Sequence, residues 1–175
     1  MASFSDAYTE ALATAPRDVV LYDTFEFHHA TFAEPARIAK GWDTIDARLE
    51  AGAPANGGEV VTWQAVPIEV SLPTSQHEAL PRLRLEIHDA SRLLMDPIEA
   101  AIADPQPLRV IYRPFMSSRL LQGPELLPPP DFYLSDIDID SRVVSGRASL
   151  GDLLNRSFPR RTYTAADFPG LVRST

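Results

Sequence analysis

Proline constrains this chain most, since it occupies 16 of the 175 positions. It has no backbone N–H and disrupts helix interiors, so this number limits long helices and favours short strands joined by shaped loops. Between the prolines, apolar and polar residues alternate. The clearest alternation runs from Arg82 to His88, where Leu83, Leu85 and Ile87 fall on one side. This period of two predicts a β-strand with one buried face.

Similar alternation predicts about seven strands. They are residues 19–28, 42–50, 59–72, 82–88, 108–115, 132–139 and 142–148. Pro67 interrupts the third of them and predicts an edge or a bend there. Helix-capping patterns at Ser3, Asp96 and Ser149 predict three short helices. We therefore expect a β-rich fold, mainly an antiparallel β barrel or sandwich with a few short helices.

The composition excludes several classes of site. The chain has no cysteine, which rules out disulfides, thiolate metal sites, iron–sulfur clusters and cysteine nucleophiles. A net charge of -8 argues against general binding to nucleic acids or anionic membranes. No apolar run approaches the length of a membrane span, and the first residues do not resemble a signal peptide. We expect a soluble protein that is made in the cytoplasm and needs no cofactor.

Three aspartates form the sharpest charge pattern. Asp136, Asp138 and Asp140 alternate with isoleucines and fall on one face of a predicted strand. A calcium site needs a loop that wraps the ion, whereas such carboxylates lie roughly 6.5 Å apart along a straight strand. We therefore expect a solvated strand face, with Ile137 and Ile139 pointing inward.

No catalytic or metal-ligating residue is predicted. The four histidines lack metal-ligand spacing, and no nucleophile motif is present. A catalytic pair of carboxylates, as in glycosidases, remains an alternative, because two of the 24 acidic residues can always lie close together in the folded chain. On balance we expect a protein that is not an enzyme.

The segment after residue 155 is rich in aromatic and basic residues but has no helical or strand period. We therefore divide the chain into a β-rich domain, residues 1–155, and an extended interaction arm, residues 156–175. The residues expected to bind a partner are Arg156, Phe158, Arg160, Arg161, Tyr163 and Phe168. These aromatic rings need burial against something else. The arm, spanning roughly 65 Å when extended, could wrap its own domain or reach another protein.

Several stretches together resemble a family of minor tail proteins of long-tailed bacteriophages, of the tail-tip or baseplate-hub type. They are Ala15-Pro-Arg-Asp-Val-Val-Leu21, Ala51-Gly-Ala-Pro54, Val66-Pro-Ile-Glu-Val70, Leu80-Pro81 with Leu85-Glu-Ile87, Ile111-Tyr-Arg-Pro-Phe115 and the closing block from Asp152 to Leu171. Their order along nearly the whole chain makes the set fairly specific. The family is also distantly similar to the amino-terminal part of the lambda-type tail-tip protein L. The iron–sulfur segment of those proteins is not carried over, since this chain lacks cysteine.

The resemblance implies a hub-type or tail-tube-like structural subunit of the virion tail. Its partners would be other phage tail proteins, namely the distal-tail, hub and tape-measure neighbours, in a homo-oligomeric ring such as a trimer. Two other classes stay open. One is a ligand-binding or carbohydrate-binding β module that stacks sugars on Trp42 or Trp63, although Trp63 lies among apolar strand residues that favour the core. The other is a carboxylate-dependent hydrolase built around the aspartates.

Overall fold

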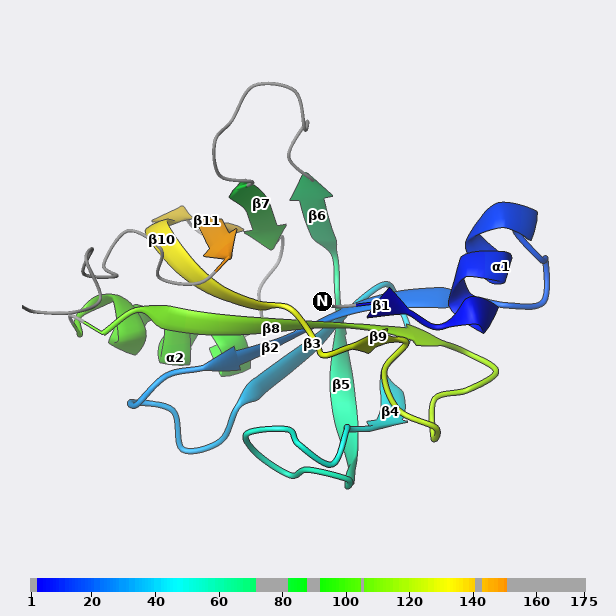
Figure 1. Ribbon diagram of the computed structural model, residues 1–175. Coiled ribbons are helices and arrows are strands. Elements are labelled where there is room, and N and C mark those ends of the chain that lie inside the picture. Colours follow the sequence, from blue (N-terminus) through cyan, green and yellow to red (C-terminus); the bar gives the residue numbers. More distant parts are fainter. Residues whose placement is uncertain (1–2, 72–81, 88–91, 105, 141–142, 151–175) are drawn as a thin grey trace, which may run out of the picture.

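Strands dominate the structure, a computed structural model that describes residues 3–71, 82–87, 92–104, 106–140 and 143–150 (Figure 1). This part of the chain has 11 strands and two helices. In chain order they are β1 (Ser3–Phe4), α1 (Asp6–Thr14), β2 (Leu21–His28), β3 (Ala36–Lys40), β4 (Ile45–Arg48), β5 (Val60–Val66), β6 (Ile68–Ser71), β7 (Arg82–Ile87), α2 (Arg92–Ile102), β8 (Leu108–Met116), β9 (Leu126–Leu127), β10 (Asp131–Asp140) and β11 (Val143–Leu150). The prediction of a β-rich fold with a few short helices is confirmed.

One large sheet organises the molecule. Nine strands follow the order β4-β5-β3-β2-β8-β10-β11-β7-β6, and β1 pairs with β9 in a separate two-stranded sheet. Neighbours in the large sheet are antiparallel except β3 and β5, which run parallel. Figure 1 shows the sheet curled, with β6 and β7 rising on one side and β2, β3 and β5 on the other.

A bend at Pro67 explains the curl. Only this residue separates β5 from β6, yet β5 pairs with β3 and β4 whereas β6 pairs with β7, which is near the opposite end of the strand order. Residues 60–71 therefore link the two ends of the sheet and shape it into a half-barrel. Proline has no N–H to give to a ladder, which suits it to a position between two pairings. The predicted bend is confirmed.

The main core fills the concave side of the sheet. Its buried side chains come from eight strands of the half-barrel and from α2, which contributes Ile98 and Ala101. The strand members are Phe25, Phe27, Ile38, Val66, Ile68, Leu85, Ile87, Leu108, Val110, Leu134 and Val144. Leu85 and Ile87 thus lie in the core as the alternation predicted, whereas the side chain of Leu83 lies outside the described residues.

A second core covers the opposite face of the central strands. Trp63 and Phe115 pack here with Leu49, their rings 5.8 Å apart between centroids. The strand over residues 60–71 therefore changes its buried face: it buries Trp63 on this side before the bend, and Val66 and Ile68 in the main core at the bend. The prediction that Trp63 belongs to a core is confirmed.

The first two of the three predicted helix starts need correction. Helix α1 begins after Ser5, whose Oγ accepts a hydrogen bond from the Tyr8 N–H at 3.1 Å, because Ser3 is engaged in pairing with β9. The helix buries Tyr8 and Ala11 and leaves Leu12 exposed. Helix α2 begins at Arg92 and holds Pro97 within it, so Asp96 is not its cap.

The third expected helix is wrong at its start. Ser149 belongs to β11 and pairs with Tyr133 and Arg82, because neighbouring strands on both sides extend the ladder to this position. The rest of that expected turn, and the domain boundary at residue 155, lie outside the described residues.

Leu85 allows a direct test of the main core, because its side chain is 1% exposed in the middle of β7. We expect Leu85→Ala to lower the free energy of unfolding by about 2–5 kcal/mol, from lost burial and the cavity left behind. Urea denaturation measures this change. Leu121→Ala is the matched control: that leucine is 59% exposed, so we expect a change within about 0.5 kcal/mol. Equal midpoints for the two variants would refute the assignment of the core.

Candidate functional site

The six residues expected to bind a partner, from Arg156 to Phe168, lie outside the described residues. The structure therefore leaves their partner-binding role as a prediction. The described residues form two other candidate sites: a buried cluster of charged residues on the central strands, and an exposed hollow beside the bend at Pro67.

The aspartate face of β10 is solvated where the structure describes it. Asp138 and Asp140 are exposed, and Ile137 and Ile139 pack against the main core, as predicted. The side chain of Asp136 is outside the described residues. Within those residues, no three histidine, aspartate or glutamate side chains are grouped so that they could hold a metal ion.

A buried arginine forms the centre of the charged cluster. Arg113 of β8 is 0% exposed and donates two hydrogen bonds to Glu50, from Nε to Oε2 at 2.9 Å and from Nη2 to Oε1 at 2.8 Å. Its Nη1 donates to Oε2 of Glu26, which is also 0% exposed. A planar guanidinium suits such a two-point contact, and buried charges are tolerated only when they are paired in this way.

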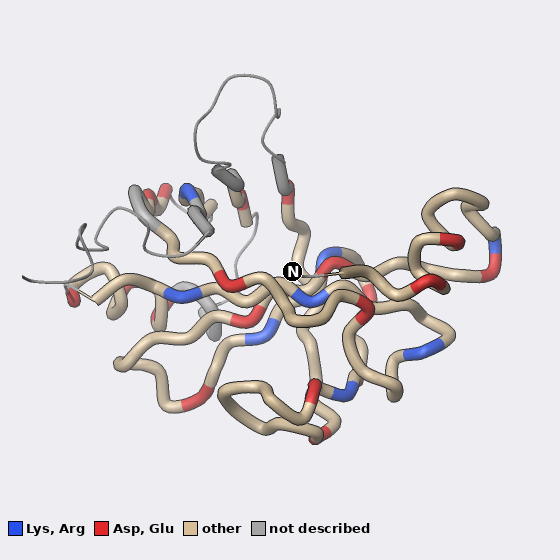
Figure 2. The backbone as a smooth tube through the Cα atoms, in the orientation of Figure 1, with Lys and Arg blue, Asp and Glu red and all other residues tan. Residues whose placement is uncertain are grey.

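Two more side chains complete the surroundings of Glu26. Arg37 of β3 lies opposite Glu26 in the register and donates from Nε to its Oε1 at 2.8 Å. His28 Nε2 lies 3.1 Å from Glu26 Oε2. Arg37 also donates to Asn56 Oδ1 at 2.8 Å, which ties the loop after β4 to the sheet. Figure 2 shows acidic and basic segments close together where the central strands run past one another.

This cluster stabilises the charged form of Glu26. Burial alone would raise the pKa of Glu26, but the close contact with His28 and the charges of Arg113, His28 and Arg37 outweigh it and lower the pKa to about 2. Burial would likewise lower the pKa of Arg113, yet its bonds to Glu50 and Glu26 raise it. Both charges are therefore retained at neutral pH, and the cluster acts as a structural tie rather than as a source of protons.

A second polar group lies near α1. Tyr112 donates from its hydroxyl to Asp23 Oδ1 at 2.6 Å, and burial, followed by the charge of Asp23, raises the pKa of Tyr112. Ser5 Oγ donates to Glu125 Oε2, and the Ser5 N–H donates to the Glu125 carbonyl at 2.8 Å. The Tyr112–Asp23 bond joins β8 to β2, and the Ser5–Glu125 bonds tie the start of α1 to the segment before β9.

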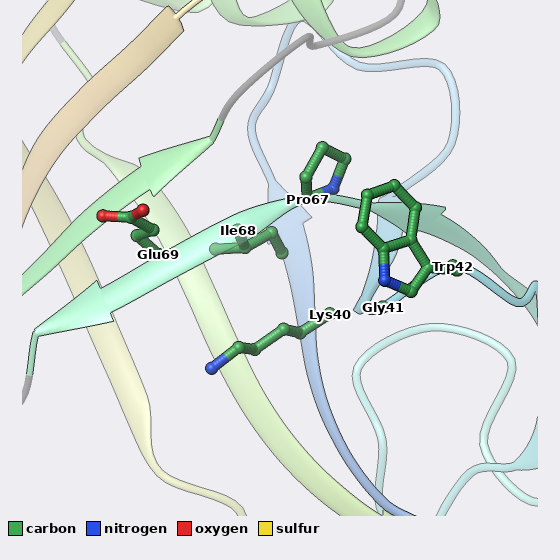
Figure 3. Close-up of a pocket in the computed structure, with 6 residues that line it drawn as sticks. All are labelled: Lys40, Gly41, Trp42, Pro67, Ile68 and Glu69. Atoms are coloured by element: carbon green, nitrogen blue, oxygen red, sulfur yellow. The ribbon is translucent and has the colours of Figure 1, made fainter.

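The exposed hollow lies where β3 ends and β6 begins. It encloses about 370 Å³ and is lined by Lys40, Gly41, Trp42, Pro67, Ile68 and Glu69. Trp42 is 90% exposed, an unusual position for so large an apolar side chain. Figure 3 shows its ring beside Pro67 and the Lys40 side chain extended along β6. We call this region the Trp42 hollow.

Sequence reasoning missed the charged cluster, although one signal for it was present. Thr24, Glu26 and His28 alternate with Phe25 and Phe27 in β2, so the strand has a polar face. Glu50 and Asn56, from the segment between β4 and β5, bind Arg113 and Arg37 of the cluster. The sequence of β2 itself does not indicate these contacts.

Comparison with protein families gives a match over most of the chain. Residues 7–163 match the family model described as a domain of unknown function, DUF1833. No curated protein matches the chain. Among the residues described, no helix has the length and apolar character needed to cross a membrane.

Glu26 should make stability depend on pH in the acid range. Its pKa is about 2 in the folded protein against an ordinary 4.5, so its contribution is present above pH 4.5 and is lost as the pH falls toward 2. The difference corresponds to about 3 kcal/mol. We expect Glu26→Gln to lower the free energy of unfolding at pH 7 and to flatten its decline between pH 4.5 and 2.

Urea denaturation at a series of pH values measures this effect. Glu34→Gln is the control, because Glu34 is exposed and its replacement should change the profile little. A Glu26→Gln variant whose acid profile matches that of the unaltered protein would contradict the role given to Glu26.

The aspartate face of β10 should not depend on calcium. We expect the triple change of Asp136, Asp138 and Asp140 to Asn to leave the fold intact, because Asp138 and Asp140 are exposed and the alternating isoleucines supply the buried side. Circular dichroism and the melting temperature with and without calcium check this. A rise of several degrees with calcium, abolished in the triple variant, would instead establish a calcium site.

Proposed function

The chain belongs to the DUF1833 family, and we propose that it acts as a structural subunit of a bacteriophage tail tip, assembled with neighbouring tail proteins. The proposal joins two lines of support. One is the resemblance of its ordered sequence stretches to minor tail proteins of the hub type. The other is a β-rich half-barrel that carries free strand edges.

The free edges are the observation that carries the proposal. In the part of the chain that the structure describes, β4 and β6 are the terminal strands of the large sheet, and each has one neighbouring strand. The outer side of β4 is partly used, because the Arg48 N–H donates to the Leu120 carbonyl at 2.9 Å, so β6 is the more open edge. A terminal strand presents unpaired N–H and C=O groups, which is a template for another chain. A protein built to assemble can use such edges, whereas a monomeric enzyme has to protect them.

The buried charges fit the same function. Glu26, Arg37, Glu50 and Arg113 are all held by one another, and they join three strands to the loop after β4. Such mutual pairing gives a rigid framework. The exposed positions of Asp138 and Asp140 likewise offer little to a hydrolase, which needs carboxylates in a pocket with other polar groups.

A second candidate function is a carbohydrate-binding module, which the exposure of Trp42 favours. An exposed indole ring beside a hollow can stack on the apolar face of a sugar. Titration with soluble oligosaccharides, followed by Trp fluorescence and compared with Trp42→Ala, tests this alternative. Saturable binding that the variant loses would favour it.

Electron microscopy of labelled particles tests the tail-tip proposal directly. A phage that encodes this chain, with an epitope tag added to it, is imaged after binding of a gold-labelled antibody. We expect the label at the distal end of the tail. Particles that contain no label, while the tagged protein is present in the lysate, would refute the proposal.

Removal of residues 156–175 should separate folding from assembly. We expect the shortened protein to keep its far-ultraviolet circular dichroism, since the three core clusters lie in the described residues, yet to fail to enter tails. A full-length variant with Phe158, Tyr163 and Phe168 replaced by Ser should behave in the same way if burial of these rings drives assembly. A shortened protein that does not fold would place the arm in its own core, and infectious tails without the arm would refute the interface.

A further inference from the structure

We propose that the Trp42 hollow is the docking site for residues 156–175. The inference rests on the proposed function and deepens it, because it names the surface that the arm occupies. Two properties of the hollow suit the arm, namely a backbone edge without a neighbouring strand among the described residues and an exposed aromatic ring. The net charge of the rest of the chain also attracts the arm.

The backbone edge is produced by the end of β3. Lys40, the last residue of β3, pairs with Val66, and the chain then turns away at Gly41, whose φ of 146° suits glycine. Beyond Val66 the strand continues as β6, with β7 on one side and no neighbour on the other among the described residues. An extended segment can add to such an edge through main-chain hydrogen bonds. The arm, with no helical period and with Pro159 and Pro169, suits an extended conformation.

The aromatic ring supplies a contact for the arm's side chains. Trp42 is 90% exposed and lies beside Pro67, so the hollow has an apolar rim (Figure 3). The face of an indole ring attracts a guanidinium group and packs well on other aromatic rings. The arm offers both kinds of group within a few residues, in Arg160, Arg161 and Tyr163.

Charge favours contact between the arm and the rest of the chain. Residues 156–175 contain four arginines and one aspartate, a net charge of +3, which leaves -11 for residues 1–155. The arm is therefore drawn to the rest of the chain, or to a second copy of it. Within the hollow, Lys40 is the only lysine of the protein and has no ion pair among the described residues. Asp167, the only acidic residue of the arm, is a suitable partner for it.

The arm is long enough to reach. Ser149 pairs with Arg82, and Ser71 with Arg84, so the described chain ends near the end of β6 that is farther from Pro67. The four residues of β6 span roughly 13 Å, and the 20 residues of the arm could extend over roughly 65 Å. This length suffices for the hollow of the same molecule or of a neighbouring copy.

Disulfide trapping tests the docking site. Because the chain has no native cysteine, only the introduced cysteines can form a disulfide. One full-length variant combines Lys40→Cys with Ala165→Cys, and another combines Lys40→Cys with Ala166→Cys, to cover both strand faces. The matched control combines Leu121→Cys with the same arm positions, since Leu121 is exposed and lines a different hollow. After mild oxidation, non-reducing gels measure the yield of disulfide.

We expect a yield several-fold higher from the Lys40 position than from the control, and a several-fold loss when Trp42→Ala is added. A band of monomer mobility places the arm in its own hollow, and a dimer band places it in that of a neighbour; either supports the site. Equal yields from the two positions, or yields that Trp42→Ala does not change, would overturn it. Because the labelling of particles uses no cross-link, a labelled tail tip without the disulfide would reject this docking site alone.

Discussion

The pairing of Arg113 with Glu26 and Glu50 is the interaction on which the rest of the structure depends. The three charged groups come from β2, β8 and the segment after β4, which are distant in sequence; Arg113 and Glu26 are fully buried, and Glu50 is partly buried. Removing one partner from such a group leaves a buried charge without compensation, at a cost of about 3–5 kcal/mol. The cluster therefore stabilises one arrangement of the central strands. Arg37, which binds Glu26, includes β3 in that arrangement. The second core includes Phe115, two residues after Arg113 in β8, and Leu49, next to Glu50.

The half-barrel follows from a different constraint, which is local. Residues 60–71 take part in three ladders, because Pro67 divides them into β5, which pairs with β3 and β4, and β6, which pairs with β7. The sheet can therefore curl without a closing loop. The curl encloses the main core, and α2 contributes Ile98 and Ala101 to it. It also leaves β4 and β6 as terminal strands, so the feature that shapes the core also creates the edges available for assembly.

The sequence allowed most of the longer strands and the bend to be predicted, because both depend on neighbouring residues. Three strands were missed, namely β1, β9 and the central strand β3. The alternation in residues 82–87 correctly placed Leu85 in the core, and Pro67 marked the bend. Features that depend on distant residues were missed. The predicted cap of α1 was Ser3, but the observed cap is Ser5, because Ser3 pairs with β9, more than 120 positions away. The charged cluster was missed for the same reason, since Arg113 and Glu50 are 63 positions apart. The hollow beside Trp42 depends on where β3 ends relative to β6, which no local pattern specifies.

The bent strand also has a mechanical consequence. A load applied to β6 along its axis passes through the covalent backbone at Pro67 into β5, which is held by β3 on one side and β4 on the other. The load is then shared by three ladders whose hydrogen bonds lie across the direction of pull, so they must yield together rather than one after another. A partner attached at β6 would thus pull on both ends of the sheet at once, and the half-barrel would respond to tension as a single body.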